Sequence, residues 1–95
     1  MNPVRDKSLM FYTYVLKSQT SGRLYTGSTK DLRKRFLQHN SGKSSHTKIE
    51  APWSLIYYEG HLNEDDARSR EVYLKSGMGK RYIKNRIKRF LSLTG

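Results

Sequence analysis

The chain has 95 residues, 35% of them hydrophobic, so it can fill one hydrophobic core and we expect a single domain. It has no cysteine and only three histidines, which excludes a disulfide scaffold, a thiolate nucleophile and a cysteine zinc site. Its formal net charge of +11 favours a polyanionic partner, because a small domain this basic repels itself. There is no apolar run of the roughly 20 residues that a membrane helix needs, and no signal-peptide core, so we expect a cytoplasmic protein.

Two short strands are predicted to open the domain. Residues 1–9 show no periodic pattern, and we interpret them as a flexible arm before a domain over residues 10–93. Aromatic and β-branched residues dominate residues 10–17, which is typical of a strand. The turn-forming stretch 18–22 leads to a short returning strand at 23–27, so the two strands are predicted to form a β-hairpin.

A helix is predicted to follow the hairpin. Asp31 is a typical N-cap residue, and Gly42 lies where a helix would end. Between them, the helical spacing of Leu32, Phe36 and Leu37 predicts the buried stripe of this helix.

The second half is predicted to contain a third strand and two helices. Residues 53–58 (WSLIYY) form the most apolar segment, and we expect them to be the most buried strand. Asn63 is predicted to cap a second helix that breaks at residues 76–79, and a last helix is expected over residues 80–93. The predicted order is therefore β-β-α-β-α-α.

Two pairs of side chains could carry chemistry. Tyr14 and Tyr25 could meet near one end of the hairpin, although tyrosine is also an ordinary strand residue. Arg35 and His39 are four residues apart on the first helix and so project from one face. A guanidinium beside an imidazole suits a phosphodiester whose charge grows during reaction, while the alternative is a solvated basic face with a surface histidine.

Glu71 is the third candidate. It falls within the predicted buried stripe that Ala67, Leu74 and Met78 form, where a carboxylate is costly unless a cation or donor satisfies it. A hard divalent ion with waters completing its shell is one solution. A salt bridge to Arg70 or another neighbouring base is the alternative.

Taken in order, these segments resemble the GIY-YIG nuclease superfamily. The first signature segment matches residues 12–16 (YTYVL), and the second matches residues 24–28 (LYTGS). The helix sequence 31–35 (DLRKR) leads to the remaining signature residues: the arginine, the histidine one turn later and the lone metal-ligating acid match Arg35, His39 and Glu71. The similarity covers roughly residues 12–86. Tyr12 departs from the signature, because a glycine usually lies there.

The resemblance implies a fold of class α/β (α+β), a small single domain in which helices flank a three-stranded antiparallel sheet. It implies hydrolysis of nucleic-acid phosphodiester bonds with Mg²⁺ or Mn²⁺ on Glu71. Tyr14 or Tyr25 would take a proton from the attacking water, Arg35 would stabilise the developing charge, and His39 would assist proton transfer. Because a free tyrosine has a pKa of about 10, we expect a cation such as Arg35 to lower it.

Basic residues near the site are expected to hold the nucleic-acid backbone: Lys30, Arg33, Lys34, Lys43 and Lys48. Phosphate contacts carry no sequence information, so binding should fall steeply with salt. DNA is favoured over RNA, no membrane partner is expected, and a protein partner could supply specificity to a monomer or weak homodimer. The alternative function is a non-catalytic nucleic-acid-binding module on the same scaffold.

Overall fold

The computed structural model describes residues 10–94, and the expected arm of residues 1–9 lies outside this described part. The elements follow in the order β1 (Phe11–Ser18), β2 (Leu24–Thr29), α1 (Leu32–Asn40), the 3₁₀ helix η3 (Lys48–Glu50), β3 (Trp53–His61), α2 (Glu64–Lys75), α3 (Gly77–Arg86) and α4 (Lys88–Thr94). The strands form one antiparallel sheet of order β2-β1-β3, which confirms the predicted α+β fold. Within residues 10–94, none of the helices combines the length and apolar character of a membrane span.

The central strand of the sheet is β1, and it is the most buried strand. Every residue from Thr13 to Leu16 is buried, because β2 and β3 pair with its two edges and helices cover its two faces. The prediction that residues 53–58 form the most buried strand is wrong. β3 lies at an edge of the sheet, and Tyr58 is 56% exposed, so apolar composition did not reveal the strand's position.

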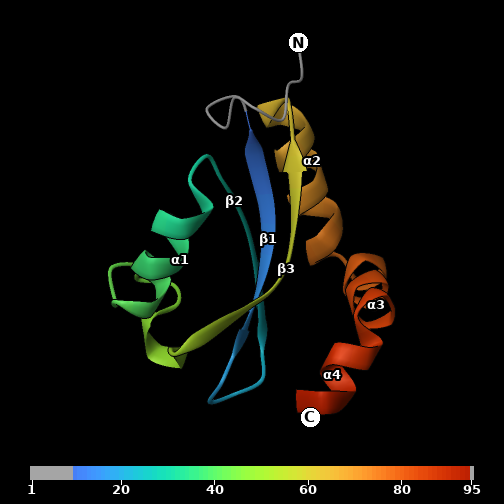
Figure 1. Cartoon of the computed structure of the whole chain (residues 1–95). Coiled ribbons are helices and arrows are strands. Elements are labelled where there is room, and N and C mark those ends of the chain that lie inside the picture. The colour runs from blue at the N-terminus through green and yellow to red at the C-terminus, as the bar shows by residue number, and fades with distance from the viewer. Residues whose placement is uncertain (1–9, 95) are drawn as a thin grey trace.

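The two faces of the sheet carry separate cores. In Figure 1, α1 covers one face, and α2, α3 and α4 lie on the other. Alternation along β1 sends Tyr14 and Leu16 toward the α1 side, while Val15 packs with residues of α2 and α3. Leu37 is not part of the predicted buried stripe of α1, because it is 59% exposed, whereas His39 is fully buried there.

Side-chain caps begin both α1 and α2, as predicted. The Asp31 carboxylate accepts a hydrogen bond from the backbone N–H of Lys34, and the Asn63 side chain accepts from the first turn of α2. The predicted break at residues 76–79 is shorter than expected: Ser76 alone separates α2 from α3 and caps α3 through a hydrogen bond from the Gly79 N–H. The predicted helix over residues 80–93 is in fact two helices, because Ile87 leaves helical geometry with φ −117° and ψ 31°.

Candidate active site

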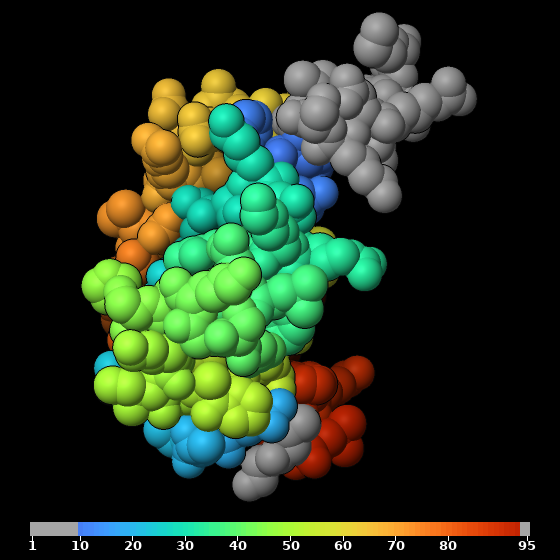
Figure 2. Space-filling model, turned by 90° about the vertical axis from the view of Figure 1, so that its left-hand side faces the viewer, coloured from blue at the N-terminus to red at the C-terminus, as the bar shows by residue number. Residues whose placement is uncertain are grey.

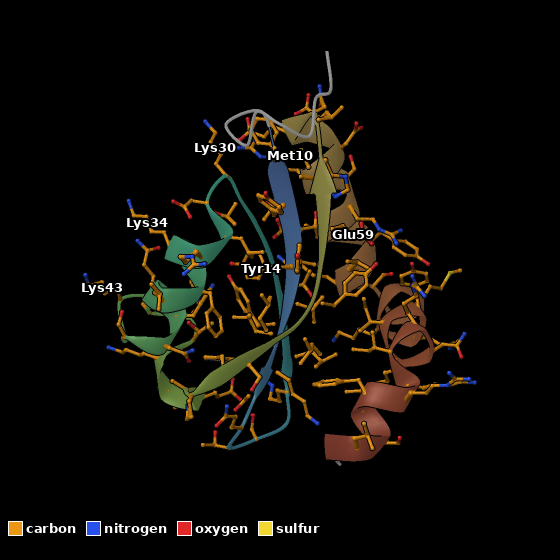
Figure 3. The ribbon with its side chains drawn as sticks, in the orientation of Figure 1. Met10, Tyr14, Lys30, Lys34, Lys43 and Glu59 are labelled. Atoms are coloured by element: carbon orange, nitrogen blue, oxygen red, sulfur yellow. The ribbon has the colours of Figure 1, made fainter. Side chains whose placement is uncertain are left out.

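A buried hydrogen bond between a tyrosine and a histidine lies at the centre of the α1 side of the sheet. The Tyr14 hydroxyl oxygen is 2.8 Å from His39 Nε2, and both side chains are almost completely buried. Figure 3 shows Tyr14 between β1 and α1. Gly27 makes room for this ring, because a Cβ atom at that position would lie 2.6 Å from the Tyr14 hydroxyl oxygen. Gly27 of the second signature segment therefore leaves the space that the Tyr14 ring of the first segment occupies.

The other ring nitrogen of His39 is also hydrogen-bonded. Its Nδ1 atom is 2.7 Å from the hydroxyl oxygen of Thr47, which is buried. The Trp53 indole N–H donates to the Thr47 carbonyl at 2.8 Å and so fixes the loop that supplies this hydroxyl. Thr47 lies within the part of the sequence that resembles the family, but its spacing predicts no role for it, because it lies in a polar loop with no periodic relation to His39.

The protonation of Tyr14 and His39 follows from their burial. Burial, together with the positive charge of Arg35, lowers the pKa of His39 to about 4, so its imidazole is neutral at pH 7. Burial and the interaction with Tyr25 raise the pKa of Tyr14 to about 12, although the Arg35 guanidinium opposes this rise. Arg35 therefore lowers the pKa of Tyr14 as expected, but desolvation outweighs this contribution and the net shift is upward.

Tyr25 and Arg35 complete the predicted cluster. The Tyr25 ring centroid lies 4.9 Å from that of His39 and 6.4 Å from that of Tyr14. Arg35 is half-buried, and one of its N–H groups donates to the Gln38 side chain at 3.1 Å. The structure thus brings the four predicted residues Tyr14, Tyr25, Arg35 and His39 together, and we name this group the Tyr14 cluster. The surface-histidine alternative is wrong because His39 is fully buried.

Glu71 lies on α2, and its side chain contacts β2. Its carboxylate accepts a hydrogen bond from the Ser28 hydroxyl at 2.7 Å and is ion-paired with Lys75 at 2.8 Å. The negative charge of Glu71 also contributes to the raised pKa of Tyr14, which places it within electrostatic range of the cluster. Only 22% of its side chain is exposed.

The alternative of a salt bridge between Glu71 and a neighbouring base is confirmed, but the base is Lys75 and not Arg70, which binds Glu59 of β3 at 2.9 Å. The expectation that Met78 belongs to the same buried stripe as Glu71 is wrong, since Met78 lies on α3 and is 68% exposed. The pairing with Lys75 had a sequence signal, namely the four-residue spacing of opposite charges on a helix.

Glu71 could hold a divalent cation as a single protein ligand. Among residues 10–94 there is no group of three or more histidines and acids that could hold a metal ion. A hard cation such as Mg²⁺ keeps several waters and often takes only one or two carboxylates, so one carboxylate can suffice. The carboxylate already accepts a cation, because the Lys75 ammonium lies against it. The donor set therefore fits a hydrated divalent ion.

The predicted basic residues are all exposed. Four of them line the hollows along the outer side of α1: Lys30, Arg33, Lys34 and Lys43. Figure 3 shows three of these lysines extending away from the sheet, and Figure 2 shows the face that α1 and its following loop build. Lys48 lies apart from them, on η3.

The sequence of this chain is similar to those of known proteins. A family model described as the GIY-YIG catalytic domain matches residues 10–88. The UPF0213 protein CPE1444 of Clostridium perfringens is 42% identical over 67 residues, which cover 70% of this chain and 71% of the relative. A UPF0213 protein of Pediococcus acidilactici is 41% identical over 83 residues, which cover 79% of this chain and 82% of the relative.

A solved structure is also similar to this chain. It is the solution NMR structure of the UPF0213 protein BH0048 from Bacillus halodurans, which is 28% identical. The alignment covers 90% of this chain and 86% of that chain, with a TM-score of 0.47. Because the family model spans most of the sequence, from residue 10 to residue 88, this protein belongs to the GIY-YIG family of nuclease-type catalytic domains.

Proposed function

We propose that this protein is a divalent-metal-dependent endonuclease that hydrolyses DNA phosphodiester bonds with a water activated by Tyr14. The observation that carries the proposal is the 2.8 Å hydrogen bond between the Tyr14 hydroxyl and His39 Nε2. Because the imidazole is neutral at pH 7, Nε2 can accept the Tyr14 proton while Nδ1–H donates to the Thr47 hydroxyl. Membership in the family supports nuclease activity in general.

The proton moves only when the water attacks. The pKa of Tyr14 is raised and that of His39 is lowered, so the proton stays on Tyr14 in the free protein. As the water oxygen bonds to phosphorus, its proton passes to the Tyr14 oxygen and the Tyr14 proton passes to His39 Nε2. The bond to the leaving oxygen then breaks and solvent supplies that oxygen's proton. His39 Nε2 returns its proton to the Tyr14 oxygen, and Tyr14 releases the proton taken from the water to solvent, which restores the free protein. Arg35 holds the charge that accumulates on the non-bridging oxygens.

Tyr25 has a supporting role in this scheme. Its ring packs edge-on against the His39 imidazole, with 60° between the two planes. This contact orients the imidazole that receives the proton. Comparing Tyr14→Phe with Tyr25→Phe tests the assignment, because Tyr14→Phe removes the base, whereas Tyr25→Phe keeps the ring that contacts His39 and should retain more of the cleavage.

Glu71 is the residue that would hold the metal. Its carboxylate is partly buried, and its hydrogen bond with Ser28 fixes its orientation. When bound, a divalent ion supplies positive charge that stabilises the leaving oxygen. The exposed lysines along α1 would hold the substrate backbone, and the net charge of +11 supports a polyanionic substrate.

The first experiment compares cleavage and binding in the same samples. Labelled DNA duplexes, nicked, flapped and branched, are incubated with the protein and Mg²⁺, Mn²⁺ or EDTA. Tyr14→Phe should lose cleavage by about 100-fold or more and keep its affinity for DNA. Tyr73→Phe, which removes a hydroxyl on the other side of the sheet, is the matched control. Equal cleavage by Tyr14→Phe and the wild type would overturn the assignment.

A second variant separates the nuclease from the binding module. Glu71→Gln should lose metal-dependent cleavage but retain DNA binding, because a neutral amide is a poor ligand for a hard cation. A wild-type protein that binds DNA tightly in a salt-sensitive manner, yet cleaves none of the substrates with either metal, would instead establish the non-catalytic module.

A further inference from the structure

Two aromatic rings form an accessible surface immediately beside the Tyr14 cluster. Tyr58 lies directly opposite Tyr14 in the β1–β3 register, and Tyr12 precedes Tyr14 by two residues on the same face of β1. The rings of Tyr12 and Tyr58 meet edge to face, with centroids 6.2 Å apart. Tyr58 is 56% exposed, so this pair is not part of a closed core.

These rings belong to a shallow hollow between the sheet and α1. Its volume is about 790 Å³, which lies within the range of sites for nucleotide-sized ligands. Aromatic and aliphatic side chains make up most of its lining: Tyr12, Leu32, Phe36, Leu37, Leu55 and Tyr58. Lys30 and Arg33 line it as well, and both are exposed.

The charges beside the hollow favour an anionic occupant. The one acid in its lining is Asp31, and the Asp31 carboxylate caps α1 by accepting the Lys34 N–H. Lys30 and Arg33 have no acidic partner at ion-pair distance among the ion pairs of residues 10–94. An apolar aromatic surface with cations beside it matches a nucleotide, which has a planar base next to a phosphate.

The hollow adjoins a second hollow that contains Arg35. Lys30 and Asp31 line both hollows. A strand whose phosphate lies against Arg35 could therefore place an adjacent base over the tyrosine pair. Bases inside a continuous duplex are stacked and cannot reach a protein ring, whereas an unpaired base can.

We propose that the hollow formed by Tyr12 and Tyr58 binds an unpaired nucleobase next to the scissile phosphate. This inference rests on the proposed nuclease function and names its substrate class. The substrate is DNA with at least one unpaired nucleotide, such as a flap, a bulge or a fork, and a continuous duplex is a poor substrate.

The test uses the full chain and DNA that carries one 2-aminopurine, placed in the unpaired segment of a flap or in a matched duplex. Stacking on a tyrosine quenches this fluorescent base. In EDTA, the wild type should quench the flap probe and bind it more tightly than the duplex. Tyr58→Ala should abolish the quenching and weaken flap binding about tenfold, with duplex binding unchanged. Phe90→Ala, which truncates an exposed aromatic ring of α4, is the control and should behave as the wild type.

The outcomes distinguish this inference from the proposed function. Binding in EDTA reports base stacking without catalysis, and cleavage in Mg²⁺ or Mn²⁺ reports the nuclease. Unchanged quenching and unchanged flap affinity in Tyr58→Ala would overturn the inference even if the wild type cleaves. Sedimentation of the same samples tests whether the hollow is a dimer interface. If Tyr58→Ala loses a dimer that the wild type forms, with no change in DNA binding, the hollow binds a second copy of the chain and the inference is overturned. Quenching without cleavage would retain the base-binding site and refute the nuclease.

Discussion

His39 links the stability of the protein to pH. Its pKa is lowered to about 4 by burial and by Arg35, whereas an unfolded histidine titrates near 6.5. Below pH 6.5 the unfolded chain therefore binds a proton that the folded protein does not, so stability falls as the pH drops toward 4. The full shift corresponds to about 3 kcal/mol in the free energy of unfolding.

We predict that His39→Gln reduces this loss of stability with falling pH. Urea denaturation at several values between pH 7 and pH 4 measures it, and the exposed His46→Gln variant is the control. The wild type and the His46 variant should lose stability more steeply than His39→Gln. Equal slopes for all three proteins would mean that His39 is not neutral in the fold.

If Glu71 holds a metal ion as proposed, Lys75 competes with that ion for the carboxylate. Its ammonium lies 2.8 Å from the carboxylate, and 55% of its side chain is exposed. Because exposed ion pairs contribute only about 0.2–1 kcal/mol, we predict that Lys75→Gln tightens Mn²⁺ binding by a few fold. Electron paramagnetic resonance of free Mn²⁺ measures this without DNA. Lys80→Gln is the matched control, and equal affinities in both variants would show that Lys75 leaves the carboxylate freely.

The catalytic candidates could be predicted from sequence, but their partners could not. The resemblance to the family signature indicates Tyr14, Arg35 and His39, and their catalytic roles stay predictions. Thr47 and Ser28 orient His39 and Glu71 through hydrogen bonds across 8 and 43 residues of sequence. Such contacts depend on the folded chain path, and no local pattern marks them.

At the scale of elements, the capping residues that begin helices can be predicted from the sequence, but the order of the strands in the sheet cannot. The caps at Asp31 and Asn63 depend on side chains within one turn, so the starts of α1 and α2 were predicted correctly. The central place of β1 depends on pairing with two distant strands, and composition pointed instead to residues 53–58. The glycines at 77 and 79 are typical of a break between helices, but both belong to the first turn of α3.

The junction of α2 and α3 explains one of these glycines. A Cβ atom on Gly79 would collide with the backbone of Tyr73 and Leu74, whereas a Cβ atom on Gly77 would meet nothing within 4 Å. We predict that Gly79→Ala destabilises the fold by about 2 kcal/mol or more, because the gain in helix propensity does not offset the overlap. Gly77→Ala should be neutral or slightly stabilising. Chemical denaturation compares them, and equal stabilities would refute the close packing of these helices.

At the scale of the whole molecule, the positive charge is divided between two sides of the sheet. Lys30, Lys34 and Lys43 extend from the α1 side, where the Tyr14 cluster lies. A second basic stretch, formed by Lys84, Arg86, Lys88 and Arg89 of α3 and α4, lies on the opposite side. If DNA binds at the candidate active site as proposed, it contacts the first group, so removing equal charge from the two sides should weaken DNA binding unequally.

We predict that the triple variant Lys30/Lys34/Lys43→Ala loses DNA affinity and salt sensitivity together. Each phosphate contact adds about 0.9 to the slope of log affinity against log salt, so losing two or three contacts should lower that slope by about 2–3. The triple variant Lys84/Lys88/Arg89→Ala removes the same charge from exposed residues on the other side and should retain most of the slope. Fluorescence anisotropy from 50 to 300 mM salt measures both. Equal losses would show that net charge alone attracts the DNA, and that the α1 side does not hold the backbone.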